Sequence, residues 1–168
     1  MLRMLAKLGE IGRHDAPVKI VESSRDGALV ASADTDRRLK VWRGSQELYS
    51  LNLRAWHERF RALDRIRALK LSDDSQTIYV ASGETVKAIQ AGTGEIIWEH
   101  GRLPTWAFLI TCPQTLAIGA DRIAVGYDDG AIEVVKNGSW HTWHDNDAPK
   151  AAAFLPGDRL LAGTDLVS

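Results

Sequence analysis

The feature that most constrains the fold is a short strand pair that recurs along the chain. Three times an apolar, alternating run is followed, after a tight turn, by a second such run. The second runs are LKVW from Leu39, VKAI from Val86 and IEVV from Ile132, so their starts lie 47 and then 46 residues apart. A unit repeated at this period is typical of repeat architectures, in which each unit buries its faces against its neighbours.

Each repeat contains further segments with the pattern of strands. The segments that precede the pairs are VKIVES from Val18, IRALKLS from Ile66, WAFLIT from Trp106 and KAAAFL from Lys150. The segments that follow the first three pairs are ELYSLNL from Glu47, EIIWEH from Glu95 and SWHTW from Ser139. Turn signals such as RDG, DDS and GTG separate the runs, and consecutive strands joined by tight turns pair antiparallel. The repeat is therefore predicted to be a four-stranded meander.

These repeats predict an all-β fold built of β-propeller blades. We expect about three complete four-stranded antiparallel blades and the first strands of a fourth, with a ring that is incomplete within one chain. Residues 1–14 are expected to form the leading strand of a closing blade, and residues 15–168 a partial propeller domain. The expected blades span about 15–53, 65–100, 104–144 and 148–168.

Three explanations of an incomplete ring stay open. The chain is the amino-terminal half of a longer protein, it dimerises into a closed ring, or its open arc is capped by another protein. Two copies would supply nearly all the strands of an eight-bladed ring. Each explanation gives a partner to the unpaired edge and the uncovered blade face, which otherwise favour association.

The run SADTDRRLKVW, from Ser32, resembles the end of a WD40 repeat. That resemblance implies a structural hydrogen-bond network whose members here are His14, Ser32, Asp36 and Trp42. In the third repeat the turn residue is Asp129, and Val135 stands where the family has Trp. The resemblance also implies a rigid, non-enzymatic scaffold for protein–protein interaction, with a protein or another copy of the chain as partner.

A different class is suggested by the second repeat. Its run AIQAGTGEIIW, from Ala88, resembles the strand ends of quinoprotein-type propellers. The alternative function is therefore a propeller enzyme, or a propeller that binds a cofactor or metal. No nucleophile elbow or phosphate loop accompanies this run, so our main interpretation includes no cofactor and no catalytic residue.

The segment RAWHERFRALDRIR, Arg54 to Arg67, lengthens the link between the first two repeats. It interleaves arginines with aromatic residues, which are enriched in interface hot spots and also suit nucleic-acid backbones. In a third interpretation its apolar groups cap the ring while the arginines stay solvated. We place a candidate partner-binding surface here, made of Trp56, His57, Arg59, Phe60 and Arg61. The WD40 resemblance implies that it lies on the same face as the Asp36 and Asp129 turns.

Charge and composition narrow the remaining possibilities. Lys and Arg total 21 against 22 for Asp and Glu, so no overall field favours nucleic acid. One cysteine excludes an intrachain disulfide and fits a cytoplasmic location. No apolar run approaches the length of a membrane span. His141 and His144 suggest a metal site. Residues three apart on a strand point to opposite faces, however, so we expect no metal site there.

Overall fold

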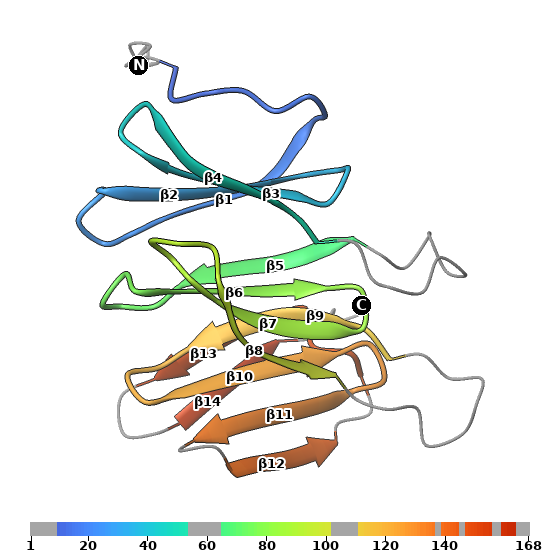
Figure 1. Ribbon diagram of the computed structural model, residues 1–168. Coiled ribbons are helices and arrows are strands. Elements are labelled where there is room, and N and C mark those ends of the chain that lie inside the picture. The colour runs from blue at the N-terminus through green and yellow to red at the C-terminus, as the bar shows by residue number, and fades with distance from the viewer. Residues whose placement is uncertain are drawn as a thin grey trace, which may run out of the picture.

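The computed structural model describes residues 10–53, 65–101, 111–136, 139–144, 147–155 and 159–163. These residues form three four-stranded antiparallel sheets and one two-stranded sheet, which we number as blades one to four. The sheets follow one another in an arc, and the ring is not closed (Figure 1). The predicted all-β architecture of propeller blades is therefore confirmed. Every strand of a blade pairs with the next strand along the chain, so each blade is a simple meander.

The strand bounds are as follows. Blade one contains β1 (Val18–Ser23), β2 (Leu29–Asp34), β3 (Arg38–Arg43) and β4 (Gln46–Asn52). Blade two contains β5 (Ile66–Leu71), β6 (Thr77–Ser82), β7 (Thr85–Gln90) and β8 (Ile96–Gly101). Blade three contains β9 (Pro113–Ile118), β10 (Arg122–Tyr127), β11 (Ala131–Lys136) and β12 (Ser139–His144). Blade four contains β13 (Ala151–Leu155) and β14 (Arg159–Gly163).

One strand differs from the sequence prediction. The first strand of blade three is β9, Pro113–Ile118, and not the run from Trp106, which lies outside the described residues. The short Gly119–Asp121 turn joins β9 directly to β10, and Leu116 pairs with Val125 across the hairpin. The strand pattern of β9 is weak because the strand begins with a proline and only two of its residues, Thr115 and Ile118, are β-branched.

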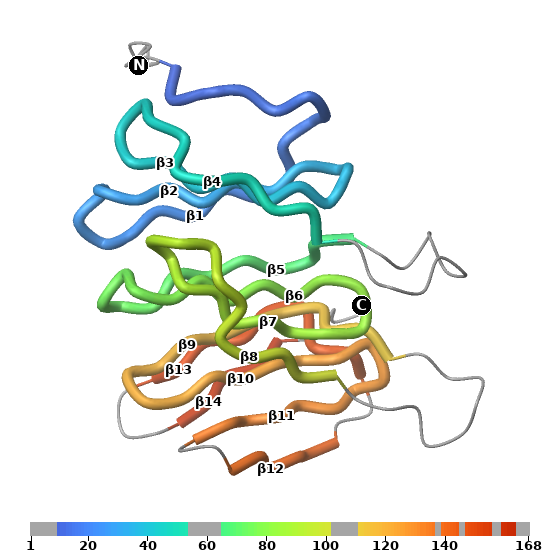
Figure 2. Tube along the Cα trace, viewed as in Figure 1, coloured from blue at the N-terminus to red at the C-terminus, as the bar shows by residue number. Residues whose placement is uncertain are grey.

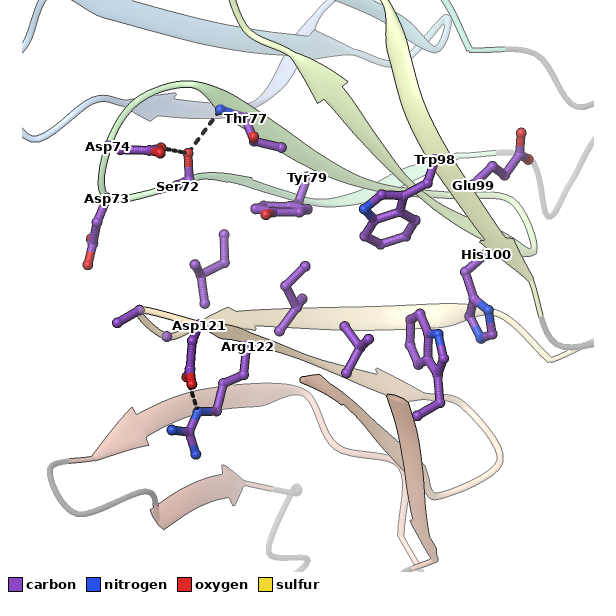
Figure 3. A pocket seen from close by; sticks show the side chains of 16 residues that line it. Ser72, Asp73, Asp74, Thr77, Tyr79, Trp98, Glu99, His100, Asp121 and Arg122 are labelled. Atoms are coloured by element: carbon purple, nitrogen blue, oxygen red, sulfur yellow. Dashed lines mark hydrogen bonds and ion pairs between the residues drawn. The ribbon is translucent and has the colours of Figure 1, made fainter. Parts of the chain in front are cut away.

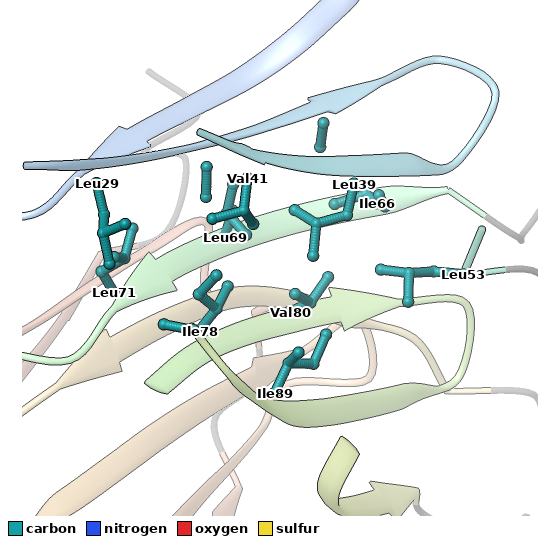
Figure 4. Close-up of a cluster of buried hydrophobic side chains, with 13 residues drawn as sticks. Leu29, Leu39, Val41, Leu53, Ile66, Leu69, Leu71, Ile78, Val80 and Ile89 are labelled. Carbon is teal, nitrogen blue, oxygen red and sulfur yellow. The ribbon is translucent and has the colours of Figure 1, made fainter. Parts of the chain in front are cut away.

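The blades pack through two apolar seams. In the first seam, Leu39 and Val41 of blade one meet Ile78 and Val80 of blade two, and all four are fully buried (Figure 4). In the second seam, side chains of blade two meet Val125 and Tyr127 of blade three. The strand period of two sends alternate residues of a middle strand to opposite seams, which explains why these strands are apolar on both faces.

The inner strands follow one another around the arc, with β1 against β5, β5 against β9 and β9 against β13 (Figure 2). At the end of the arc, blade four covers blade three with one face only. Phe154 lies beside Arg122, with the guanidinium 5.6 Å from the ring centre. The opposite face of blade four carries Leu155 and Leu161, which are 39% and 58% exposed. The described chain thus ends its arc with an uncovered, partly apolar blade face.

The leading strand proposed for residues 1–14 falls largely outside the described residues, which begin at residue 10. Residues 10–17 contain no strand. They pass over the face of blade one that points away from blade two. The backbone of Gly12 packs against the indole of Trp42, so closely that an added Cβ would lie 2.1 Å from the nearest ring atom.

Candidate functional site: the groove between blades two and three

A buried polar network occupies the face of blade one that points away from blade two. Nδ1 of His14 lies 2.8 Å from Oδ2 of Asp34, and Nε2 of His14 lies 2.7 Å from Oγ of Ser32. The indole Nε1–H of Trp42 donates to the same Ser32 oxygen at 2.9 Å. Because an ionised carboxylate only accepts, Nδ1 of His14 is the donor to Asp34. In the neutral ring, Nε2 then accepts from the Ser32 hydroxyl, and every member has a partner.

The carboxylate of this network belongs to Asp34 and not to Asp36, which the sequence analysis had placed there. Ser32 and Asp34 are two residues apart on β2, so both side chains point to the face that carries His14. Asp36 lies beyond the end of β2, in the turn, and is exposed. Its backbone N–H donates to Oδ1 of Asp34 at 2.9 Å, so it supports the network through its main chain.

Burial and hydrogen bonding act in opposite directions on Asp34. Burial raises the pKa of its carboxyl, but donation from the Arg38 N–H, from His14 and from the Asp36 N–H brings the net pKa below its usual value. Asp34 therefore stays ionised at neutral pH. The carboxylate fixes the His14 ring and the β2–β3 turn together.

The connectivity of Ser32, His14 and Asp34 is that of a hydrolase triad, but the setting is structural. The side chains of His14 and Asp34 are 3% and 1% exposed. The Ser32 oxygen already accepts a hydrogen bond from Trp42, and Gly12 covers that indole. A nucleophile must reach its substrate, whereas Ser32 is buried and its hydroxyl group is engaged by His14 and Trp42. The network holds the start of blade one in place.

A second histidine cluster lies at the seam between blades two and three. Nε2 of His100, on β8, lies 3.0 Å from Oε2 of Glu133 on β11. The Tyr127 hydroxyl donates to the same carboxylate oxygen at 2.9 Å. The His100 ring stacks on Trp140, with ring centres 3.6 Å apart and planes at 13°. This histidine side chain is 27% exposed, so the cluster is open where the blade-one network is closed.

Asp129, the residue that the WD40 resemblance assigned to blade three, lies in the β10–β11 turn. Its Oδ1 accepts from the backbone N–H of Ala131 at 3.0 Å. The turn is the counterpart of the β2–β3 turn, because Arg37 and Gly130 both precede the third strand with positive φ, 67° and 84°. Asp129 thus shapes its turn, and the acidic partner of His100 comes from Glu133 instead.

A groove of about 750 Å³ lies beside the His100 cluster, between blades two and three (Figure 3). One wall is a cross-strand row on blade two, in which Tyr79 pairs with Ala88 and Ala88 with Trp98. The other wall is a row across all four strands of blade three, made of Ile118, Ile123, Val135 and Trp140. The Ala88 side chain is small, so Tyr79 and Trp98 approach each other, with ring centres 6.2 Å apart.

The ends of the groove are acidic. Asp73 and Asp74, in the β5–β6 turn, face Asp121 of the β9–β10 turn and Arg122, the first residue of β10, across the open end (Figure 3). Glu99 lines the groove at the outer strand of blade two. Oδ1 of Asp74 accepts from the Ser72 hydroxyl and from the Gln76 N–H, which lower the pKa of this carboxyl. Hydrogen bonds from Lys136 and Arg122 lower the pKa of Asp121 in the same way.

The groove is not the surface that the sequence analysis selected. Trp56, His57, Arg59, Phe60 and Arg61 all lie outside the described residues, so that surface stays a prediction. The β5–β6 and β9–β10 turns lie at the opposite end of the blades from the β2–β3 and β10–β11 turns, which carry Asp36 and Asp129 (Figure 1). Alternation along the strands predicts that Trp98 and Trp140 lie between blades, but this signal does not distinguish an open seam from a filled one.

The metal alternative finds no support in the described residues. Among them, no group of three or more His, Cys, Asp or Glu side chains could hold a metal ion. His141 and His144 pair with Val134 and Ala131 on neighbouring β11, and both are exposed. In the same part of the chain, no helix has the length and apolar character to cross a membrane.

Blade architecture, the His14 network and the unclosed arc together define a WD40-like β-propeller. Residues 6–43 match the family described as "WD domain, G-beta repeat". A comparison with curated protein sequences gives no significant match.

Two solved structures of computationally designed proteins share the fold. The crystal structure of the designed Ika4 protein is 21% identical, with a TM-score of 0.73 over 96% of this chain and 93% of that one. The designed Ika8 protein is 20% identical, with a TM-score of 0.69 over 90% of this chain. The chain spans 44% of the length of Ika8. At these identities the likeness concerns the fold alone.

Proposed function

We propose that this protein is a propeller scaffold that mediates protein–protein interaction and acts without catalysis. Its ring is completed by a second copy of the chain or by the blades of another protein. The observation that carries the proposal is the uncovered face of blade four, where alternate residues of β13 and β14 are exposed. An apolar blade face of this kind is normally buried against the next blade.

The exposed face has the composition of a blade seam. Ala153 pairs with Leu161 and Leu155 with Arg159, so two leucines and an alanine form a small apolar surface beside one cation. The residues on the other face of the same strands, Phe154 among them, are half-buried against blade three. Blade four therefore already uses one face for blade packing, and its second face fits the same role.

The other end of the arc is exposed as well. Val18 and Val21 of β1 are 46% and 59% exposed. In a ring made of two copies, blade four of one copy would meet blade one of the other. Cytoplasmic location belongs to the same proposal and is supported by the single, buried Cys112.

The proposal is tested by Leu161→Asp, which places a charge in the middle of the exposed face. We expect the wild-type chain to sediment as a discrete dimer at tens of micromolar and the variant to sediment as a monomer. Ile97→Asp is the matched control, because Ile97 is 51% exposed but lies on the outer strand of blade two. A wild-type chain that stays monomeric at every concentration would remove the second copy from the proposal.

A further inference from the structure

We propose that the groove between blades two and three binds an extended peptide segment in which an arginine or lysine adjoins an aromatic or aliphatic side chain. This inference rests on the proposed function, because it names the chemistry of a partner for the scaffold. It concerns a different surface from the exposed face of blade four.

The apolar walls of the groove offer ring faces that the chain itself does not fill. Tyr79 and Trp98 on one wall, and Trp140 on the other, are only half-buried although they lie in a seam between blades. Trp98 and Trp140 meet edge to face, with ring centres 6.1 Å apart and planes at 88°. Both tryptophans lie on the outermost strands, β8 and β12, so this contact borders the outer part of the groove, and the half-buried ring of Tyr79 on β6 lies farther in. A planar or aliphatic side chain inserted there would bury ring surface that now faces water.

The electrostatics of the groove favour a cation. Four carboxylates line it, from Asp73, Asp74, Glu99 and Asp121; Lys87 contacts Glu99, and Nζ of Lys136 lies 2.9 Å from Oδ2 of Asp121. Arg122 already contacts Asp121, with Nε 2.9 Å from Oδ1. Asp73 is 66% exposed, and its contact with Arg25 is long, at 3.4 Å. A guanidinium or ammonium group entering the open end therefore meets the carboxylates of Asp73 and Asp74.

The cation and the apolar side chain must be adjacent, because the acidic and aromatic parts of the groove are adjacent. Asp74 lies near enough to Tyr79 to affect its titration: burial and the Asp74 charge both raise the pKa of the Tyr79 hydroxyl. A cation held by Asp74 would thus also lie near an aromatic ring, which adds a cation–π attraction. Phosphate-rich ligands are disfavoured by the same carboxylates.

The shape of the groove fits a short stretch of peptide. The blade-three wall crosses four strands, from Ile118 on the inner strand to Trp140 on the outer strand. Three strand spacings amount to roughly 14 Å, which is the length of four or five residues of extended chain.

Binding is measured with ¹⁵N-labelled protein and two unlabelled, terminally blocked hexapeptides, GARWAG and GAEWAG, at low salt. We expect GARWAG to shift the indole N–H signals of Trp98 and Trp140 more than that of Trp42, which lies on blade one. GAEWAG should bind at least about tenfold more weakly, since it replaces an attraction by a repulsion. Binding of GARWAG should weaken as salt is raised to about 0.5 M.

A matched pair of variants locates the cation. Asp74→Asn should weaken GARWAG about two- to fivefold, as expected for one exposed ion pair. Asp26→Asn is the control, because Ser24, Asp26 and Ala28 form the same turn in blade one that Ser72, Asp74 and Gln76 form in blade two. It should leave the affinity within twofold. Trp98→Leu keeps apolar volume but removes the ring, and should also weaken the peptide.

Three outcomes would overturn the inference. These are equal affinity for the two peptides, no binding of GARWAG at millimolar concentration, or shifts that leave Trp98 and Trp140 unchanged. Peptide binding and dimerisation are read separately, since the mass of the protein reports on the blade-four face and the indole signals report on the groove. A failure of one therefore leaves the other standing.

Discussion

The His14 network of blade one and the His100 cluster at the seam between blades two and three each join a histidine to an acid, yet only the first is sealed. In blade one, Trp42 donates to the network and is covered by Gly12. Counted from the β10–β11 turn, Val135 occupies the place of Trp42, and it lines the groove. Trp140, from the outermost strand, stacks on His100 instead.

This difference shows how one repeat can serve structure in one blade and recognition in another. A large indole on the third strand reaches the buried serine and closes the space beside the histidine. Valine is too short to do so, and the space beside it becomes part of the groove. The acid also moves, from Asp34 on β2 to Glu133 on β11, so the histidine is held from a different strand.

The largest expected contrast concerns the two tryptophans. Trp42→Ala removes a buried indole and its hydrogen bond to Ser32, and should cost about 3–5 kcal/mol of unfolding free energy. Trp140→Ala removes a half-buried ring and should cost about 1–2 kcal/mol. Urea denaturation of both variants measures the two losses. Equal losses would contradict the distinction between a sealed network and an open cluster.

The next contrast separates the two acids of blade one. Asp34→Ala leaves the His14 ring and two backbone N–H groups without their acceptor, and should cost about 2–4 kcal/mol. Asp36→Ala removes an exposed carboxylate and keeps the backbone N–H that donates to Asp34, so it should change stability by less than about 0.5 kcal/mol. Chemical denaturation at pH 7 compares them. If Asp36→Ala were the costlier change, the network would have been assigned to the wrong acid.

Acid pH tests the same carboxylate in another way. The pKa of Asp34 is lowered in the folded protein, so its contribution to stability is present above the unfolded value, near 4, and is lost as pH falls through the folded value. Asp34→Asn should therefore be less stable than wild type at pH 7, and the two should converge as the pH is lowered toward 2. Thermal unfolding of both proteins between pH 2 and pH 7 measures this difference in stability. A difference that stays constant over the whole range would be inconsistent with an ionised Asp34.

The smallest contrast concerns the turns that precede β3 and β11. Gly130→Ala places a Cβ at a φ of 84° and should cost about 1 kcal/mol. Arg37→Gly relieves a side chain held at a φ of 67° and should change stability by less than that, in either direction, because Gly also raises the entropy of the unfolded chain. Melting temperatures of both variants suffice. A Gly130→Ala variant as stable as wild type would show that the turn relaxes.

Much of the blade pattern could be predicted because it rests on local alternation and tight turns. The first run of each predicted pair is a second strand of its blade, β2, β6 or β10, and the unclosed ring was predicted by counting the strands. The Asp36 prediction failed because a family pattern locates an acid near the turn, whereas the two-residue period of β2 decides which acid reaches His14. The first strand of blade three was missed because Pro113–Ile118 has a weak strand signature.

The groove could not be predicted in the same way. Its walls depend on which residues of blade two face which residues of blade three, and Tyr79 and Trp140 are far apart in the sequence. Strand alternation predicts that Trp98 and Trp140 lie between blades. Whether the seam is filled depends on the volumes of Ala88, which pairs with Trp98, and of Val135, which pairs with Trp140. Those volumes matter only after the strands are paired.

The central claim, that the arc is completed by another set of blades, is tested most directly by light scattering during size-exclusion chromatography over a range of concentrations. One copy of the chain has a mass of 18.5 kDa. Closure of one ring by two copies predicts a discrete species of twice this mass, with no larger aggregates. A stable species with the mass of one copy at every concentration would contradict closure by a second copy, because the face of blade four would then stay uncovered.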